Sequence, residues 1–290
     1  MSKHSVIFFG TPEFACPTLQ ALNDDGNFEV SLVITQPDKP VGRKQEITPP
    51  SVKDLAIELG IPVFQTDDIN KDFAEIPRHV YKPPDFLVVV AFGQILSKAI
   101  LKVPKVAAIN VHASLLPRWR GASPIQNSIM SGDEETGATV QRMEEEFDTG
   151  PVLAQSKTKI EKYDTTASLG KRLSEIGADL LTKTIKKNLP EKEQDKSEAT
   201  YCKKLTRESG IVSPSEMTAE EIDRYVRALV PWPGVTISSN DKKIKLIETS
   251  LSDATDSIEL KCKDDTTLNI IKLQAPGRNI VSGKEGKNLI

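Results

Sequence analysis

Residues Phe86–Phe92 read FLVVVAF, a run without a single polar side chain. A strand with one face in solvent alternates apolar and polar residues, whereas a strand buried on both faces is apolar throughout. Strands of the second kind are typical of parallel sheets that carry helices on both faces. We therefore predict that Phe86–Phe92 is a central strand of such a sheet.

Strand and helix patterns alternate on both sides of this run. Ser5–Phe9, Glu29–Thr35 and Ala107–Val111 are short β-rich runs, and the apolar spacing within residues 51–59 and 165–188 is typical of helices. This order favours an α/β domain with a parallel sheet and right-handed crossover connections. Ligands of such sheets bind beyond the carboxyl ends of the strands, so functional residues are expected there.

The pattern changes near residue 190. Pro190–Ala199 is rich in Glu, Lys, Asp and Ser and lacks large apolar residues, as linkers do. A helix over Ala219–Leu229, capped by Thr218, precedes short alternating runs that favour a small antiparallel barrel, OB-like, or a sandwich. The expected organisation is a first domain over residues 1–189, a linker over 190–203 and a β-barrel domain over 204–290.

Composition excludes several classes of protein. The 290 residues carry a formal net charge of -3, which gives no overall nucleic-acid footprint. The three cysteines are scattered, and the three histidines are too few for a clustered site, so neither a disulfide framework nor a metal is expected. No apolar run approaches the roughly 18 residues of a membrane helix, and the N-terminal run is too short for a secretory signal. A cytoplasmic protein without a membrane partner is expected.

Residues that can move protons follow the strand at 107–111. Asn110 and His112 alternate along the strand end and project to one face, while Asp148 lies in the turn sequence FDTGP at 147–151. An amide can donate to a developing oxyanion, an imidazole can exchange a proton near neutral pH, and a carboxylate can orient that ring. Because none of the three is a convincing covalent nucleophile, the set favours direct transfer between two bound substrates. A structural histidine beside an ordinary turn is the alternative.

A longer motif surrounds this set. Asn110–Gln126, NVHASLLPRWRGASPIQ, closely resembles the signature of the folate-dependent formyltransferases. Individually weaker similarities to that family extend over the chain: FGTPEFA at 9–15, VVVAFGQIL at 88–96, FDTG at 147–150, PWPG at 231–234 and LQAPGR at 273–278. The resemblance implies a Rossmann-like first domain that binds 10-formyltetrahydrofolate rather than a dinucleotide. The first turn contains no GxGxxG, in keeping with this.

The resemblance also implies a role for each site residue. Asn110 would bind the formyl oxygen, His112 would stabilise the tetrahedral intermediate and assist proton transfer, and Asp148 would orient His112 and relay protons. No metal is implied. The residues that would line the folate site are Ser114, Leu115, Leu116, Pro117, Phe92, Gly93, Ile95 and Leu96.

Within the family, the chain is most similar to the members that formylate methionine on initiator tRNA, which yields N-formylmethionyl-tRNA for translation initiation. Thr35–Pro40 with the following Gly42 resembles an insertion peculiar to those members, where Arg43 and Lys44 would contact the tRNA. The C-terminal domain would also bind tRNA, although its basic and acidic residues nearly balance. Initiator methionyl-tRNA and folate are the expected partners, and the protein is expected to be a monomer.

Two other functions stay open on the sequence alone. A formyltransferase of this fold could act on an amino sugar nucleotide, although the insertion and the C-terminal motifs favour tRNA. A non-catalytic relative that binds RNA or folate should have lost Asn110, His112 or Asp148, and all three are present.

Overall fold

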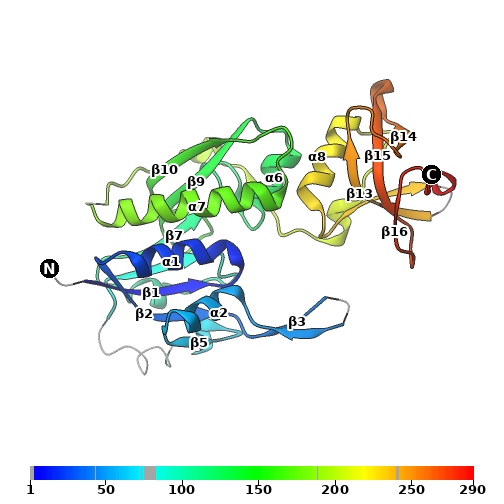
Figure 1. Cartoon of the computed structure of the whole chain (residues 1–290). Helices are drawn as coiled ribbons and strands as arrows, with labels where there is room; N and C mark the ends of the chain where they lie inside the picture. Colours follow the sequence, from blue (N-terminus) through cyan, green and yellow to red (C-terminus); the bar gives the residue numbers. More distant parts are fainter. Residues whose placement is uncertain (1–2, 43, 73, 75–82, 188, 240–241) are drawn as a thin grey trace. The chain divides into compact units, whose positions relative to one another are not determined.

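The computed structural model describes residues 3–42, 44–72, 74, 83–187, 189–239 and 242–290 (Figure 1). The chain divides into two compact units that interleave along the sequence. Unit 1 comprises Met1–Arg120, Thr136–Thr158 and Gly170–Tyr201, and unit 2 comprises Gly121–Glu135, Lys159–Leu169 and Cys202–Ile290. The sequence analysis expects a first domain over residues 1–189 and a last domain over residues 204–290. In the structure, residues 121–135 and 159–169, which lie within the first of these ranges, pack with the C-terminal unit.

Unit 1 is built on a seven-stranded sheet with the order β10-β9-β7-β6-β1-β2-β5. Its strands are β1 (His4–Gly10), β2 (Phe28–Thr35), β5 (Val63–Gln65), β6 (Phe86–Val90), β7 (Ala107–His112), β9 (Glu135–Arg142) and β10 (Val152–Lys159). The strands from β7 to β5 are parallel, and β9 runs antiparallel to β7. The predicted α/β class is confirmed, but the prediction of a wholly parallel sheet is wrong at β9. That strand is largely polar, so no apolar run predicted it.

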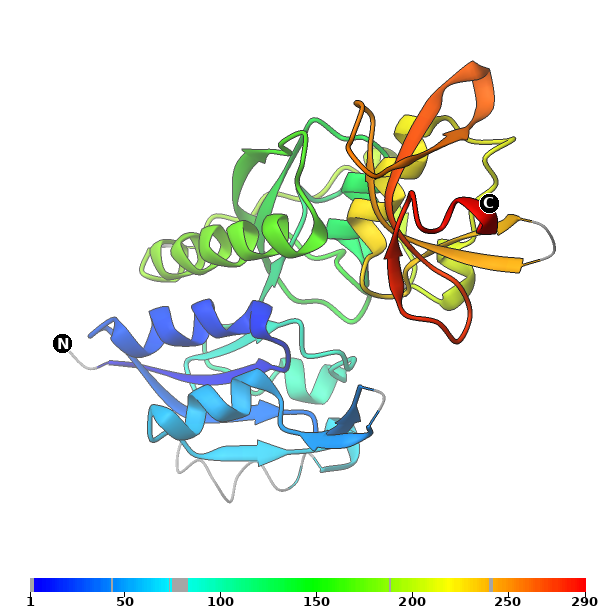
Figure 2. The ribbon, with the colours of Figure 1, turned by 45° about the vertical axis from the view of Figure 1, so that its right-hand side comes forward.

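Both faces of the central strands are buried, which explains their sequence. Val6 and Phe8 of β1 belong to the core under α1 (Cys16–Asp24), α2 (Ser51–Glu58) and α7 (Thr166–Ile185). Ile7 and Phe9 belong to the opposite core, with α3 (Ile69–Asp72) and α5 (Lys98–Leu101). Strand β6 is buried along its whole length, as its sequence predicted. Figures 1 and 2 show α1 and α2 along one face of the sheet.

The carboxyl ends of three neighbouring strands meet at one edge of this sheet. Gly10 at the end of β1 pairs with Val90 of β6, and Val89 pairs with Asn110 of β7. The loops that leave these strands therefore start side by side, and two of them contain the predicted site segments. This edge is where a ligand of a doubly wound sheet binds.

Residues 36–50, which include most of the stretch that resembles an insertion, contain a hairpin. Strands β3 (Lys39–Val41) and β4 (Glu46–Thr48) pair in antiparallel register. At its base, the Asp38 carboxylate accepts hydrogen bonds of 2.8 Å from Lys53 Nζ and from Gln65 Nε2. The Lys53 ammonium and the Gln65 amide hold the pKa of this carboxyl below its usual value. Lysine and glutamine side chains from α2 and β5 therefore fix the root of the hairpin.

Unit 2 contains a five-stranded antiparallel sheet in which β16 pairs with β15 beside the path β12-β13-β15-β14. Its strands are β12 (Val235–Ser239), β13 (Lys242–Ser250), β14 (Ile258–Lys261), β15 (Thr267–Gln274) and β16 (Ile280–Ser282). The predicted antiparallel C-terminal strands are confirmed. Helix α8 (Ala219–Leu229) has the predicted bounds and the predicted N-cap, Thr218, which shares a capping box with Glu221.

Shorter elements accompany this sheet and helix. Helix α6 (Pro124–Met130) packs against α8, and Arg224 Nε donates a hydrogen bond of 3.2 Å to the Met130 carbonyl. Strands β8 (Arg120–Gly121) and β11 (Tyr201–Cys202) form a separate two-stranded sheet. Among the described residues, none of the helices has the length and apolar character that crossing a membrane requires.

Candidate active site

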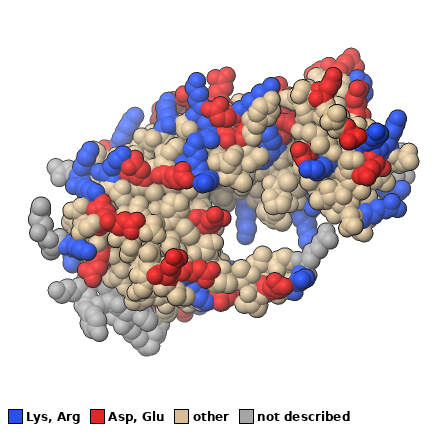
Figure 3. All heavy atoms as spheres, viewed as in Figure 1, with Lys and Arg blue, Asp and Glu red and all other residues tan. Residues whose placement is uncertain are grey.

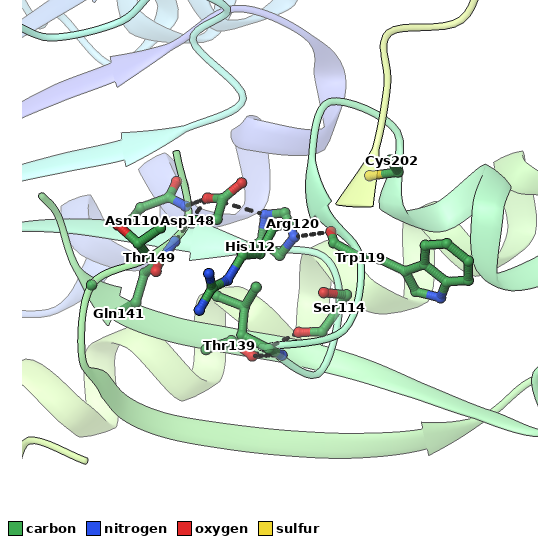
Figure 4. Close-up of polar contacts among 12 residues, drawn as sticks. Asn110, His112, Ser114, Trp119, Arg120, Thr139, Gln141, Asp148, Thr149 and Cys202 are labelled. Atoms are coloured by element: carbon green, nitrogen blue, oxygen red, sulfur yellow. Dashed lines mark hydrogen bonds and ion pairs between the residues drawn. The ribbon is translucent and has the colours of Figure 1, made fainter. Parts of the chain in front are cut away.

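Asn110 and His112 lie at the end of β7 with two polar partners on the neighbouring strand. The antiparallel register places Gln141 of β9 opposite Asn110, and Thr139 opposite His112. Side chains of directly paired residues lie on the same face and contact each other. The predicted common face of Asn110 and His112 therefore also contains an amide and a hydroxyl (Figure 4).

The structure brings Asp148 to the same place, as the sequence predicts. Its Oδ1 accepts hydrogen bonds from Gln141 Nε2 at 2.8 Å and from Asn110 Nδ2 at 3.3 Å. The same oxygen lies 3.5 Å from His112 Nδ1, and both side chains are nine-tenths buried. Asp148 adopts a left-handed backbone conformation with φ of 54°, which is costly for a residue other than glycine. The three predicted residues thus form one cluster around a single carboxylate oxygen.

The His112 ring lies between two acceptors. Nδ1 faces the Asp148 carboxylate, and Nε2 lies 2.9 Å from the Trp119 carbonyl oxygen. A carbonyl oxygen only accepts, so Nε2 must donate to it. These two contacts hold the His112 ring in one orientation, with Nδ1 toward the carboxylate.

The loop after β7 is fixed by Thr139, a residue that the sequence analysis missed. Thr139 Oγ1 donates to the Ser114 carbonyl at 2.6 Å and accepts from the Leu116 amide at 3.1 Å. Gln155 Nε2 donates to the Leu116 carbonyl at 2.8 Å. Ser114 and Leu116 are buried in this arrangement, whereas Leu115 and Pro117 are partly exposed. Of the four residues in this loop that were predicted to line the folate site, Leu115 and Pro117 are thus the accessible ones.

The other four residues predicted to line the folate site lie in the loop after β6, and they too are partly buried and partly exposed. Phe92 and Leu96 are buried in the core of unit 1, whereas Gly93 is exposed and Ile95 is 54% exposed. The Phe92 carbonyl accepts hydrogen bonds from Gln36 Nε2 and Thr11 Oγ1, at 2.9 and 3.1 Å. The side chains of Phe92 and Leu96 therefore support this loop from the core, and Gly93 and Ile95 are the accessible ones among the four predicted residues.

Of the two residues predicted to contact tRNA, the structure describes one. Arg43 lies outside the described residues, and Lys44 is exposed in the turn that joins β3 to β4. Figure 1 shows this hairpin extending beyond the sheet to which it is attached. The structure gathers Asn110, His112 and Asp148 but places Lys44 on this separate projection.

The cluster has the composition of an acid–base and oxyanion site. No group of three or more His, Cys, Asp or Glu residues suited to a metal ion occurs among the residues described in the structure. Cys16, near the end of β1, is a poor nucleophile because burial, followed by the charge of Glu13, raises the pKa of its thiol to about 11. The chemistry that the cluster supports is therefore proton transfer and stabilisation of an oxyanion.

Two family models match the sequence of the chain. Residues 3–185 match the model described as formyl transferase, and residues 204–288 match the model described as formyl transferase, C-terminal domain. The chain belongs to the formyl transferase family. It is therefore a formyl-transferring enzyme, and the resemblance carried by residues 110–126 is confirmed. The Rossmann-like character expected of the first domain of this formyl transferase is confirmed as well.

Relatives of this formyl transferase align over most of its length. It is 43% identical to the methionyl-tRNA formyltransferase of Caldicellulosiruptor saccharolyticus over 251 residues, which are 85% of this chain and 80% of that one. It is 39% identical to the methionyl-tRNA formyltransferase of Methylococcus capsulatus over 299 residues, which are 98% of this chain and 96% of that one.

Solved structures share the fold of this formyl transferase. Methionyl-tRNA formyltransferase from Clostridium thermocellum has a TM-score of 0.63 at 17% identity and covers 97% of this chain and 100% of its own. The N-formyltransferase from Helicobacter canadensis in complex with folinic acid and dTDP-3-aminofucose has a TM-score of 0.69 at 18% identity and covers 95% and 100%. At these identities the likeness concerns the fold alone.

Proposed function

We propose that this formyl transferase moves the formyl group of 10-formyltetrahydrofolate to the α-amino group of methionine on initiator methionyl-tRNA. The observation that carries the proposal is the cluster of Asn110, His112 and Asp148 around one carboxylate oxygen. Sequence similarity of about 40% to methionyl-tRNA formyltransferases over most of the chain supports tRNA as the acceptor.

The three residues divide the chemistry among them. The folate supplies the formyl group, and its N10 leaves with a proton. Asn110 Nδ2 has two N–H groups, of which one donates to Asp148 and the second is the donor that we assign to the formyl oxygen. We assign to His112 the stabilisation of the negative charge that develops on that oxygen as the amine attacks the formyl carbon. Asp148 accepts the proton that the attacking amine gives up and passes it to N10 of the folate as the bond between N10 and the formyl carbon breaks.

The residues at the strand ends fit a flat, partly apolar ligand such as a pterin. Ile95 and Phe147 are large apolar side chains that are 54% and 61% exposed, one in the loop after β6 and the other next to Asp148. The exposed backbone of Gly93 offers hydrogen-bonding groups beside Ile95. We propose that Gly93, Ile95, Leu115 and Pro117 contact the folate directly, and that Phe92, Leu96, Ser114 and Leu116 support them from beneath.

Two parts of the chain are proposed to contact the tRNA. One is the hairpin, through Lys44 in its turn and through Arg43, which precedes Lys44 in the sequence. The other is the C-terminal domain of residues 204–290, in which Lys243 and Lys245 of β13 are exposed while Ile244 between them is buried. Basic and acidic side chains are mixed on the face that Figure 3 shows. The proposal therefore assigns phosphate contacts to individual lysines rather than to one continuous basic surface.

A formylation assay with three acceptors tests the proposed function. The purified protein is incubated with 10-formyltetrahydrofolate and initiator methionyl-tRNA, elongator methionyl-tRNA or a dTDP-linked amino sugar. We expect rapid formylation of initiator methionyl-tRNA and much slower reaction of the other two acceptors. Preferential formylation of the amino sugar would refute the proposal in favour of a sugar formyltransferase, and absence of any transfer would indicate a non-catalytic relative.

Replacing Arg43 and Lys44 together should weaken tRNA binding. In the double variant Arg43→Ala, Lys44→Ala we expect KM for methionyl-tRNA to rise several-fold, with folate binding unchanged. Each lost phosphate contact should lower the slope of log affinity against log salt concentration by roughly one unit. The control is Lys3→Ala, which removes an exposed lysine at the amino end of β1. A double variant with unchanged tRNA kinetics and salt slope would show that the hairpin does not carry recognition.

Cellular location and assembly follow from the same proposal. Formylation of initiator tRNA must precede translation initiation, so we propose a cytoplasmic enzyme. We further propose a monomer, because the cluster around Asp148 is assembled entirely from residues of one chain. Light scattering coupled to size-exclusion chromatography should return a mass near 31.9 kDa, and a mass twice as large would refute the monomer.

A further inference from the structure

A glutamine outside every motif lies beneath the candidate site. Gln194 is 9% exposed, whereas its neighbours from Glu191 to Glu198 are all exposed. The composition of this stretch suggested a linker. A buried amide must find hydrogen-bonding partners, because leaving its polar atoms unpaired is costly. The burial of Gln194 therefore indicates a specific contact within unit 1.

The amide of Gln194 joins a buried arginine to the Asp148 turn. Its Oε1 accepts hydrogen bonds from Arg120 Nη2 at 2.8 Å and from Arg120 Nε at 3.1 Å. Its Nε2 donates to the Gly150 carbonyl at 2.7 Å and to the Asp148 carbonyl at 2.9 Å. A guanidinium only donates and a carbonyl only accepts, so the chemistry allows one orientation of this amide.

These contacts act on the segment that sets the direction of the Asp148 carboxylate. Gln194 binds the carbonyls on either side of Thr149, within a turn that is strained by the positive φ of Asp148. Its Nε2 also lies 3.4 Å from Gln141 Oε1, and Gln141 donates in turn to the Asp148 carboxylate. Gln194 therefore contacts both the backbone of the turn and the side chain that holds the carboxylate.

Hydrogen bonds fix both ends of the segment that contains Gln194, one end to β10 and the other to the loop after β7. Lys192 and Val152 exchange two backbone hydrogen bonds of 2.8 and 2.9 Å. At the other end, Thr200 Oγ1 accepts from the Trp119 amide at 2.8 Å. Trp119 in turn provides the carbonyl that orients His112. Anchoring at both ends delivers the Gln194 side chain to a defined position.

We propose that Gln194 is a positioning residue for formyl transfer, which holds the turn so that the Asp148 carboxylate faces Asn110 and His112. The proposal rests on the proposed function and extends it to a segment whose composition had marked it as a linker. Gln194 acts through Asp148 and does not touch the substrates. Displacement of a reacting group by about 1 Å can lower a rate by about 100-fold, so a residue of this kind affects the chemical step.

The variant Gln194→Glu tests this role selectively. A glutamate keeps acceptor oxygens for Arg120 but places a carboxylate oxygen against the Asp148 and Gly150 carbonyls, where Nε2 had donated. We expect kcat to fall by about 10- to 100-fold, with KM for folate and for methionyl-tRNA within about threefold of wild type. Gln194→Ala should give the same kinetic pattern. Glu193→Gln, an exposed neighbour in the same segment, is the control and should behave as wild type.

Combination with Asp148→Asn distinguishes positioning from a general structural effect. If Gln194 acts through the Asp148 carboxylate, Gln194→Glu should lower kcat by less than about threefold in the Asp148→Asn background, because effects transmitted through one group are not additive. An equal fall in both backgrounds would overturn the proposal. A kcat of Gln194→Glu equal to that of wild type would overturn it as well.

A crystal structure of Gln194→Glu provides a readout that does not depend on the substrate. We expect the Asp148 carboxylate to move away from Asn110 and His112, and an unmoved turn would overturn the positioning role. Failure of the wild-type protein to formylate methionyl-tRNA would instead refute the proposed function. In that case the position of Asp148 in the variant structure alone decides the role of Gln194.

Discussion

Asp148→Asn is expected to lower the rate of formyl transfer by about 10²–10⁴-fold while the protein stays folded. Asparagine has the size of aspartate, and its amide oxygen can still accept from Gln141 and Asn110. The substitution removes the negative charge opposite the His112 ring and the oxygen that accepts the proton of the amine. Single-turnover transfer to methionyl-tRNA at saturating folate measures the chemical step, and His112→Ala should show a fall of similar size.

Folate binding and a neighbouring substitution provide the controls for this experiment. Folate affinity of Asp148→Asn should remain close to that of wild type, because the assigned folate contacts come from other residues. Glu146→Gln makes the same chemical change at an exposed position two residues away and should leave the rate unchanged. A single-turnover rate of Asp148→Asn within threefold of the wild-type rate would remove Asp148 from the mechanism.

Gly150→Ala is expected to reduce both stability and activity, because the chain passes too close for a side chain. A Cβ atom at this position would lie 2.0 Å from the Arg142 carbonyl oxygen, a backbone atom that cannot swing away. Overpacking of this kind typically costs about 1–3 kcal/mol. The displaced segment is the one that carries Asp148, so kcat should fall by about 100-fold in addition to the loss of stability.

The two effects of Gly150→Ala are measured separately. Thermal unfolding gives the change in stability, and formyl transfer well below the unfolding transition gives the change in kcat. Gly26→Ala is the matched control, since a Cβ at Gly26 would meet nothing within 4 Å and the residue has no left-handed backbone conformation. Wild-type stability and kcat in Gly150→Ala would show that the turn tolerates a side chain and that its close approach is unimportant.

The sequence predicted secondary structure best where burial, helix capping or strand alternation involves residues that are close together in the chain. Burial on both faces makes β6 apolar at every position, so its place in the sheet followed from Phe86–Val90 alone. Helix α8 begins at the predicted residue because Thr218 and Glu221 complete a capping box within one turn. Asn110 and His112 share a face because successive strand residues alternate. In each case the interacting residues are neighbours in the chain.

Strand β9 shows where this reasoning failed. Its sequence, ETGATVQR, has no apolar run, yet Thr139 and Gln141 are buried in it. Their burial is tolerated because Thr139 pairs with the loop after β7 and Gln141 with Asp148. Those partners lie on other segments, so hydrophobic patterning could not reveal the strand, its antiparallel direction or its part in the site.

The sequence by itself determined the α/β class, the central strand, the antiparallel C-terminal strands and the family, because local periodicity and one contiguous motif specify them. Only the tertiary structure decided which of the predicted folate residues are accessible, and only it revealed the hydrogen bonds from Gln141 and Asn110 to the Asp148 carboxylate. It also showed that Gln194, in a stretch with the composition of a linker, is buried beneath the Asp148 turn. These features depend on hydrogen bonds between residues far apart in the chain, and a hydrogen bond requires a distance and a direction that residue order does not contain.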